Sequence, residues 1–487
     1  MKGVTEMPST STQQSETTRY LCAAAYLDRN FANHVITKVL QEEHRAVAPS
    51  YGVDIVPVVR HCLTAERRRR IRDTVLIGLV VLGGPLLLLA GASPAGVGLR
   101  LLLLAWAVVF AESAINRYEV LAARLLRNRF DPAAPQPPLT RRQARLLREL
   151  HENERGNVTV YSGFSPFVGC GLDQGGWSFA LNVGKGRRDL HDTLEPVPFE
   201  VEELHDEVVA ALRALDLHQL RIEDRLYVNG QDIRDDRRFL PDPFARPGAW
   251  ADTETLHRFL RAPTQRVRHY TRLQVVDWQG ELVLSIFFRC TKVGGNLFVE
   301  ASYFLLPPLR EEYHKIDNLR ATPDLAGTGE LALKATVGTI PVLLMAPIHV
   351  LAHLLSGLTR WQERRTMRRT IRANPSFDYG ATTSIRQSGM SPSYRRYFQR
   401  LDREMYIKIV EQRLLDAIIQ FLDEHDVDVS ELVERQTTIL NNGVMVSGGT
   451  IQADSLAVGT NARARAGDAV KTIAKAAPTP ARSGSRQ

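Results

Sequence analysis

Two apolar runs joined by a short loop dominate the pattern of hydrophobic and polar positions in the first quarter of the chain. The first run, residues 74–92, contains no charged residue, and the second, residues 97–112, is charged only at Arg100 and Glu112. Each run, the second when slightly extended, approaches the ~20 residues that a helix needs to cross the hydrocarbon core of a bilayer. The pattern therefore predicts a membrane helical hairpin at residues 74–115.

Arginines flank both ends of this hairpin, whereas the connecting loop at residues 91–99 carries no charge. Positively charged residues are retained on the cytoplasmic side of a membrane. The distribution therefore predicts a multi-pass protein of the cell membrane, with its N-terminus, central domain and C-terminus in the cytoplasm. The basic residues just before the first run are expected to contact anionic lipid headgroups. They are Arg67, Arg68, Arg69, Arg70 and Arg72.

A third apolar run, at residues 331–358, conflicts with this topology. A complete span would carry the arginines that follow it to the outer side, against the charge distribution of the hairpin. Pro341 and Pro347 interrupt the run, so we favour a re-entrant or interfacial segment, with a third membrane span as the alternative. The arginines after the run are then expected to lie at anionic headgroups. They are Arg360, Arg364, Arg365, Arg368 and Arg369.

Residues 155–310 have the pattern of a water-soluble domain. Strand-like runs open the segment, helical periodicity follows at residues 199–215, and three β-rich runs between 270 and 306 are separated by glycine turns. The predicted fold class is α+β: a membrane hairpin with a cytoplasmic mixed α/β domain that contains an antiparallel meander, plus a C-terminal amphipathic helix and a short β-solenoid-like segment.

The remaining segments are assigned by the same criteria. Stretches with few apolar positions are expected to be disordered, and basic or amphipathic periodicity predicts helices. The segments are 1–18 (disordered), 19–73 (N-terminal cytoplasmic helical unit), 116–154 (basic linker helices), 394–436 (amphipathic helices) and 462–487 (disordered basic tail).

The segment at residues 437–461 alternates very short apolar runs with Asn-Asn-Gly and Gly-Gly turns. This spacing is typical of a β-solenoid or a tight meander, but two or three such rungs cannot bury a core by themselves. We therefore expect the segment to stack on the same segment of neighbouring subunits in a homo-oligomer, or to recruit an unidentified protein partner.

Composition narrows the function further. The net charge of +8 and the pI near 9.4 arise largely from arginine clusters beside apolar runs, so membrane orientation explains them and no nucleic-acid partner is expected. The four cysteines are too widely spaced for a zinc motif or a disulfide framework. They are Cys22, Cys62, Cys170 and Cys290.

The glycine-rich connection at residues 162–176 is the first candidate ligand site, because exposed backbone amides can cradle a phosphate. Its spacing matches no nucleotide-binding fingerprint, so a structural loop is favoured. The pairs His191-Asp192 and His205-Asp206 suit a divalent ion but lack further ligands, and His205 is expected on a solvent-facing side of its helix. We predict no catalytic residue, no metal and no cofactor. The candidate ligand-binding residues are Gly163, Gly169, Gly171, Gly175, Gly176, His191 and Asp192.

Several stretches together resemble a known family. The runs YLCAAAYLDRNFA, APSYGVDIVPVVRHC, YSGFSPFVGCG and TTILNNGVMVSGGTIQADSLAVG, with the hairpin between the second and third, are similar to an uncharacterised family of actinobacterial integral membrane proteins. The last run also resembles glycine-rich tails of some bacterial defence and signalling proteins. The resemblance implies a membrane-bound protein and brings no activity or site residues.

These observations favour a membrane-anchored, non-enzymatic scaffold or sensor that assembles or recruits partners on the cytoplasmic face. One alternative is a membrane-bound nucleotide-binding or hydrolytic enzyme that uses the glycine-rich loop. Another is a small transporter or channel, which would need oligomerisation to build a pathway from so few spans.

Overall fold

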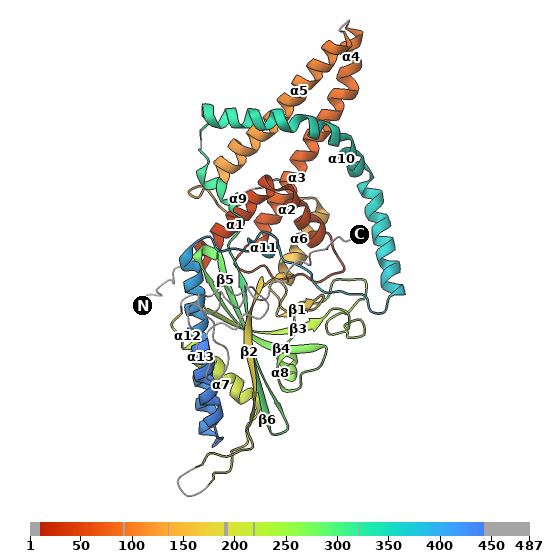
Figure 1. Ribbon diagram of the computed structural model, residues 1–487. Coiled ribbons are helices and arrows are strands. Elements are labelled where there is room, and N and C mark those ends of the chain that lie inside the picture. The colour runs from red at the N-terminus through yellow and green to blue at the C-terminus, as the bar shows by residue number, and fades with distance from the viewer. Residues whose placement is uncertain are drawn as a thin grey trace, which may run out of the picture. The chain divides into compact units, whose positions relative to one another are not determined.

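A six-stranded mixed sheet forms the centre of the computed structural model, which describes residues 10–90, 93–134, 136–188, 193–217, 220–320 and 322–442 (Figure 1). The strands follow the order β1-β3-β4-β5-β6-β2, and only the β1–β3 pair is parallel. The predicted α+β class and the meander of the last three strands are therefore confirmed. The strands are β1 (Val158–Tyr161), β2 (Leu172–Asn182), β3 (Leu220–Asn229), β4 (Val267–Asp277), β5 (Leu282–Val293) and β6 (Asn296–Leu306).

Helices α7 (Val201–Arg213) and α12 (Tyr397–Glu424) cover one face of this sheet (Figure 1). Every second residue along a strand faces these helices. Leu273 of β4 and Ile286 of β5, for example, share a hydrophobic core with Val208 of α7 and Leu414 of α12. The amphipathic periodicity of α12 thus reflects packing on the domain. The short helices around this sheet are α8 (Thr253–Arg261), η4 (Trp278–Gly280) and α11 (Ile385–Ser388).

The opposite face of the sheet holds an aromatic cluster. Phe167, from the glycine-rich connection, stacks on Phe287 with ring centroids 3.9 Å apart and also contacts Tyr227, Tyr270 and Phe304. The connection is therefore tied down by the burial of its own phenylalanine.

The N-terminal unit is helical, as predicted, but it begins earlier than expected. Residues 10–18, expected to be disordered, belong to helix α1 (Thr10–Leu27), and Glu16 and Thr17 are buried. The polar composition of this segment gave no sign of a buried helix, because its buried side chains are themselves polar. The Thr17 hydroxyl donates to the carbonyl of Gln279 at 2.8 Å. A Cβ atom at Gly280 would lie 2.4 Å from the same hydroxyl oxygen, so this turn requires glycine. The other helices of this unit are α2 (Arg29–His34), η1 (Val35–Leu40), α6 (Arg141–Glu154), α9 (Glu311–His314) and η5 (Lys315–Asn318).

Among the residues that the structure describes, three helical stretches are long and apolar enough to cross a membrane: Ile55–Leu89, Pro94–Ala122 and Leu325–Leu355. The first two correspond to the predicted hairpin runs, with α3 beginning well upstream of the apolar residues. The elements are α3 (Ile55–Gly78), η2 (Leu79–Gly83), α4 (Gly84–Leu89), α5 (Pro94–Ala114), η3 (Ile115–Ala122) and α10 (Leu325–Ala373).

Helix α10 is continuous over 49 residues and includes both Pro341 and Pro347, which were expected to break it. It packs against α3 and α5 through a small apolar cluster of Leu76, Ala105 and Ala346 (Figure 1). Neighbouring helices can compensate for the backbone hydrogen bonds that prolines remove, which explains the unbroken helix.

Helix α13 (Ser430–Asn442) extends beyond the predicted helix end. The first six residues of the predicted β segment 437–461 are consequently helical. The rest of that segment and the predicted tail at 462–487 lie outside the described residues, so their predicted structures stay predictions.

A buried carboxyl on α12 yields a test of the core. Burial raises the pKa of Glu411 above its ordinary value of 4.5, although hydrogen bonds from Tyr303 and Trp177 oppose the shift. The native chain therefore keeps a proton that the unfolded chain has released, and the free energy of unfolding falls as pH rises from 4.5 through the raised native pKa. We expect Glu411→Gln to remove this part of the pH dependence.

Thermal unfolding at several pH values between about 5 and about 9 measures this effect. The Tm of the unmodified chain should fall more steeply with pH than that of the Glu411→Gln chain. Glu424→Gln, at an exposed carboxylate of the same helix, should behave like the unmodified chain. Equal slopes for the unmodified and Glu411→Gln chains would contradict the assignment.

Candidate functional site

A basic cavity of about 770 Å³ lies between the C-terminal half of α10, the helix α6, the segment after η1 and the loop at residues 244–248. It combines five arginines, two glutamates and two aromatic residues, which gives it an excess of positive charge. The lining residues are Glu43, His44, Arg145, Glu149, Asn153, Phe244, Ala245, Arg246, Pro247, Gly248, Trp361, Arg364, Arg365 and Arg368. We call it the basic pocket.

Glu43 ties α10 to the N-terminal unit at one wall of the basic pocket. Its carboxylate accepts a hydrogen bond from Arg142 of α6 at 2.7 Å and another from Arg364 of α10. Burial would raise the pKa of Glu43, but these two guanidinium groups outweigh burial and hold the pKa below its ordinary value. Glu43 therefore stays ionised and its charge is already neutralised by protein groups.

His44 adds no positive charge to the basic pocket at neutral pH. Burial lowers the pKa of its imidazole, and the nearby Arg368 and Arg364 lower it further against the opposing effect of Glu43. The positive potential of the pocket therefore comes from arginine alone.

Three of the pocket arginines have no acidic partner among the described residues: Arg246, Arg365 and Arg368. Arg246 donates to the carbonyl of Glu42 at 3.0 Å, and its Nε has no hydrogen-bond partner among the residues that the structure describes. The other two guanidinium groups lie over aromatic rings: Arg365 is 5.0 Å from the Trp361 centroid and Arg368 is 5.9 Å from that of Phe244. Glu149, Glu43 and Glu42 attract Arg246 without pairing with it, so the planar cations that the pocket offers most freely to a ligand are Arg365 and Arg368.

The arginines predicted to contact lipid divide into two groups. Arg69 is buried and donates to the carbonyl of Ala25 at 2.9 Å, and Arg72 pairs with Asp73 at 2.7 Å and with Glu112 at 2.9 Å. These two side chains point into the protein. The exposed ones, for which headgroup contact stays a prediction, are Arg67, Arg70, Arg364, Arg365, Arg368 and Arg369; Arg68, half-buried, donates to Asn116 at 3.2 Å.

The predicted glycine candidates have structural roles. Gly163, Gly169, Gly171 and Gly175 have positive φ angles, and Cβ atoms at Gly169, Gly171 and Gly176 would collide with backbone oxygens. The Gly169 amide donates to Gln387 at 3.1 Å and the Gly175 amide donates to Asp173 at 2.7 Å. These two amides are therefore already used within the protein. The other two candidates, His191 and Asp192, lie outside the described residues.

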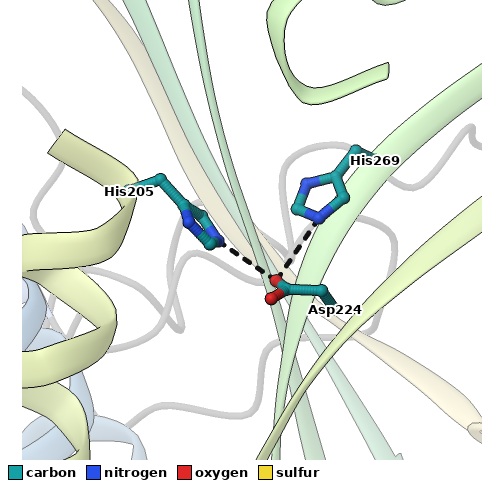
Figure 2. A group of neighbouring side chains, drawn as sticks. All are labelled: His205, Asp224 and His269. Carbon is teal, nitrogen blue, oxygen red and sulfur yellow. Dashed lines mark hydrogen bonds and ion pairs between the residues drawn. The ribbon is translucent and has the colours of Figure 1, made fainter. Parts of the chain in front are cut away.

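A second cluster, of which the sequence indicated only His205 through the pair His205-Asp206, joins His205 of α7, Asp224 of β3 and His269 of β4 (Figure 2). His205 was expected to face solvent; it is instead buried against the sheet. Its Nε2 lies 3.1 Å from Oδ1 of Asp224, and Nε2 of His269 lies 3.3 Å from the same oxygen. The Thr271 hydroxyl donates to this oxygen at 2.8 Å. We call these three residues the His-Asp-His cluster.

The charges of the His-Asp-His cluster follow from its geometry. Burial alone would raise the pKa of Asp224, but hydrogen bonds and attraction to both imidazoles hold it well below its ordinary value. Burial would lower the pKa of His205, yet Asp224 and Asp206 together raise it; for His269 burial prevails and the pKa falls. The carboxylate therefore stays ionised between two imidazoles.

A family model described as an AbeC-like domain matches residues 176–452. This range covers strands β3 to β6, the helices on the sheet, all of α10 and the His-Asp-His cluster. No curated protein matches the chain. No solved structure matches it either.

The attachment of α10 at the basic pocket can be tested without a ligand. Glu43→Gln removes the charge that Arg142 and Arg364 share, and partly exposed ion pairs contribute only ~0–1 kcal/mol, so we expect a local effect. Hydrogen exchange of the amides at residues 361–372 should accelerate, by up to about fivefold for ~1 kcal/mol, with little change in Tm.

Glu363→Gln is the matched control, because Glu363 is an exposed carboxylate on the same helix. It should leave the exchange rates unchanged. If Glu43→Gln and Glu363→Gln gave the same exchange pattern, Glu43 would not hold α10 in place.

Proposed function

The chain belongs to the AbeC-like domain family. From the basic pocket we propose a membrane-anchored, non-enzymatic sensor that binds a phosphorylated anion on the cytoplasmic face. The ligand chemistry is a phosphate group carried either by a soluble molecule or by a lipid headgroup. The uncharged tip of the hairpin and the arginines at its base support the orientation.

The observation that carries this proposal is the set of three arginines without acidic partners in one cavity. A guanidinium presents parallel N–H donors that match two phosphate oxygens, and charge-assisted hydrogen bonds of this kind are about twice as strong as neutral ones. Two of these guanidinium groups lie over the rings of Trp361 and Phe244. A phosphate would supply the negative charge that no described carboxylate provides to them.

The placement of α10 supports a sensor close to the membrane surface. Glu330, near the start of the helix, pairs with Arg117 at 3.0 Å, and Arg364, far along it, pairs with Glu43 of the N-terminal unit. Midway along α10, Nδ1 of His349 lies 3.0 Å from a carboxylate oxygen of Asp73, which is in α3 at the base of the hairpin. All three contacts lie on the side where the hairpin carries its arginines, which favours an interfacial α10 over a third span.

One side of α10 exposes an apolar stripe with helical spacing, suited to the acyl boundary of the cytoplasmic leaflet. Its members are Leu333, Val337, Ile340, Leu344, Ile348, Leu351 and Leu355. Because the same continuous helix reaches the basic pocket, binding there is expected to alter how deeply α10 sits in the leaflet. The sequence analysis predicts assembly of neighbouring subunits through residues 437–461, and we propose that this assembly passes the signal on.

The binding proposal is tested on the full chain in nanodiscs. Isothermal titration with inorganic pyrophosphate tests a soluble phosphorylated ligand. Hydrogen exchange at residues 361–368, compared between phosphatidylcholine discs and discs that also contain phosphatidylglycerol, tests a headgroup. A saturable titration with pyrophosphate identifies a soluble ligand. Slower exchange at residues 361–368 in the discs that contain phosphatidylglycerol identifies a lipid headgroup.

A double variant, Arg365→Gln with Arg368→Gln, should weaken binding of the phosphate group in whichever experiment detects it. The expected loss of affinity is about tenfold or more for each lost charge-assisted hydrogen bond, since each contributes ~1.5–3 kcal/mol. Arg369→Gln is the matched control, since Arg369 is an exposed neighbour that does not line the cavity. Equal weakening by both changes would indicate diffuse surface charge, and no response in either arm would remove the sensor proposal.

Membrane topology has its own test. All four native cysteines are buried, so single exposed cysteines can be labelled with little background. We expect an impermeant maleimide to label Gly98→Cys from outside, and Arg320→Cys and Arg369→Cys only after the membrane is opened. Labelling of Arg369→Cys from outside would show that α10 crosses the bilayer.

A further inference from the structure

We propose that His205, Asp224 and His269 form a binding site for one divalent transition-metal ion, with Zn²⁺ as the ion that their donor atoms suit best. The site lies on the face of the sheet covered by α7 and does not share a residue with the basic pocket. The inference therefore stands independently of the proposed function.

The spacing of the donor atoms matches metal coordination. Two imidazole Nε2 atoms lie 3.1 Å and 3.3 Å from one carboxylate oxygen, and all three donor atoms lie within 4.8 Å of one another. Bonds of ~2.0–2.1 Å in a tetrahedral arrangement place ligand atoms ~3.3 Å apart. An ion can therefore sit between these atoms after only small side-chain movements.

Regular secondary structure holds each ligand. In the antiparallel β3–β4 pair, Asp224 lies opposite Thr271 and Leu226 lies opposite His269, so the aspartate and histidine are diagonal neighbours on one face of the sheet. His205 approaches the same face from α7, with its ring turned toward Asp224 (Figure 2). Sites on strands and helices keep the geometry that coordination requires.

Asp206 provides an independent sign of a metal site. Nδ1 of His205 lies 3.1 Å from Oδ1 of Asp206, while Nε2 points into the cluster. Imidazoles that bind metal almost always use their second nitrogen to donate to a carboxylate or carbonyl, which fixes the tautomer and ring orientation. This second carboxylate orients His205 for coordination through Nε2.

The proposed site has three protein ligands and access from solvent. His205 and His269 are almost fully buried, whereas the side chain of Asp224 is 30% exposed and provides the way in. Zinc sites with three protein ligands leave a coordination position for water or another small ligand. The Thr271 hydroxyl, 2.9 Å from Nε2 of His205, must rotate away when that nitrogen binds the ion, and it can then donate to Asp224 alone.

The test uses the untagged full chain in detergent, stripped of metal by a chelator. Competition with a chromophoric zinc chelator should show one Zn²⁺ per chain, and Co²⁺ in its place should give visible absorption bands of low-symmetry coordination. Asp224→Asn and His269→Ala should abolish both signals. Asp206→Asn should bind Zn²⁺ about 10- to 100-fold more weakly, as for other residues that orient a metal ligand.

His257→Ala is the matched control, because this nearby imidazole pairs with Glu202 and is not part of the cluster. It should bind like the unmodified chain. Zn²⁺ should also raise the Tm of the unmodified and His257→Ala chains but not of Asp224→Asn. If Asp224→Asn fails to fold, Asp206→Asn decides the question, since the Asp206 side chain is 71% exposed.

A stoichiometry below one, or Co²⁺ bands that persist in Asp224→Asn or are unaffected by Asp206→Asn, would overturn the proposal. The three residues would then be a hydrogen-bonded polar cluster that joins α7 to the sheet.

Discussion

The guanidinium of Arg19 is completely buried, and two of its three hydrogen-bond partners come from distant parts of the chain. It donates to Glu16 at 2.7 Å within α1, to the carbonyl of Leu125 at 3.2 Å just after the second apolar helix, and to Asp317 at 2.8 Å just before α10. Removing one partner of a buried charge pair typically costs ~3–5 kcal/mol, because the remaining charge stays desolvated. The placement of the membrane helices relative to the N-terminal unit thus depends on one satisfied charge.

Asp73 has a comparable role at the base of the hairpin. It pairs with Arg72 of its own helix and with His349 of α10, while Arg72 also reaches Glu112 of α5. The apolar contacts above them involve mostly small side chains, which let the helices approach but give little directional preference. These polar contacts link α10 and α5 to α3 at the base of the hairpin, and the same α10 carries Trp361 and three arginines of the basic pocket.

The features that the sequence predicted well depend on short-range pattern. Alternating β-branched and aromatic residues with glycine turns defined the meander between Val267 and Leu306, and uninterrupted apolar runs defined the first two helical stretches that are long and apolar enough to cross a membrane. The start of helix α1, at residues 10–18, was missed because its buried residues Glu16, Thr17 and Thr18 are polar, and Thr17 finds its partner at Gln279, far along the chain.

Neither site was predicted, because each depends on contacts that no local pattern encodes. The His-Asp-His cluster requires the β3–β4 register and the rotation of α7, although Asp224, His269 and Thr271 are polar at strand positions where apolar residues would be usual, and this was an available signal. The basic pocket requires residues from four separate segments. The arginines of α10 were recognised as functional from their charge, but their cavity partners Phe244 and Arg246 gave no such indication.

The contact of Thr17 with the turn at Gly280 has a consequence for the order in which parts of the chain fold during synthesis. Residues of α1 are made long before β4 and β5, so Thr17 waits for Gln279 and Arg19 waits for Asp317 while about 260 to 300 further residues are made at ~5–20 residues per second. Docking of α1 is therefore a late event that closes the N-terminal unit onto a finished sheet.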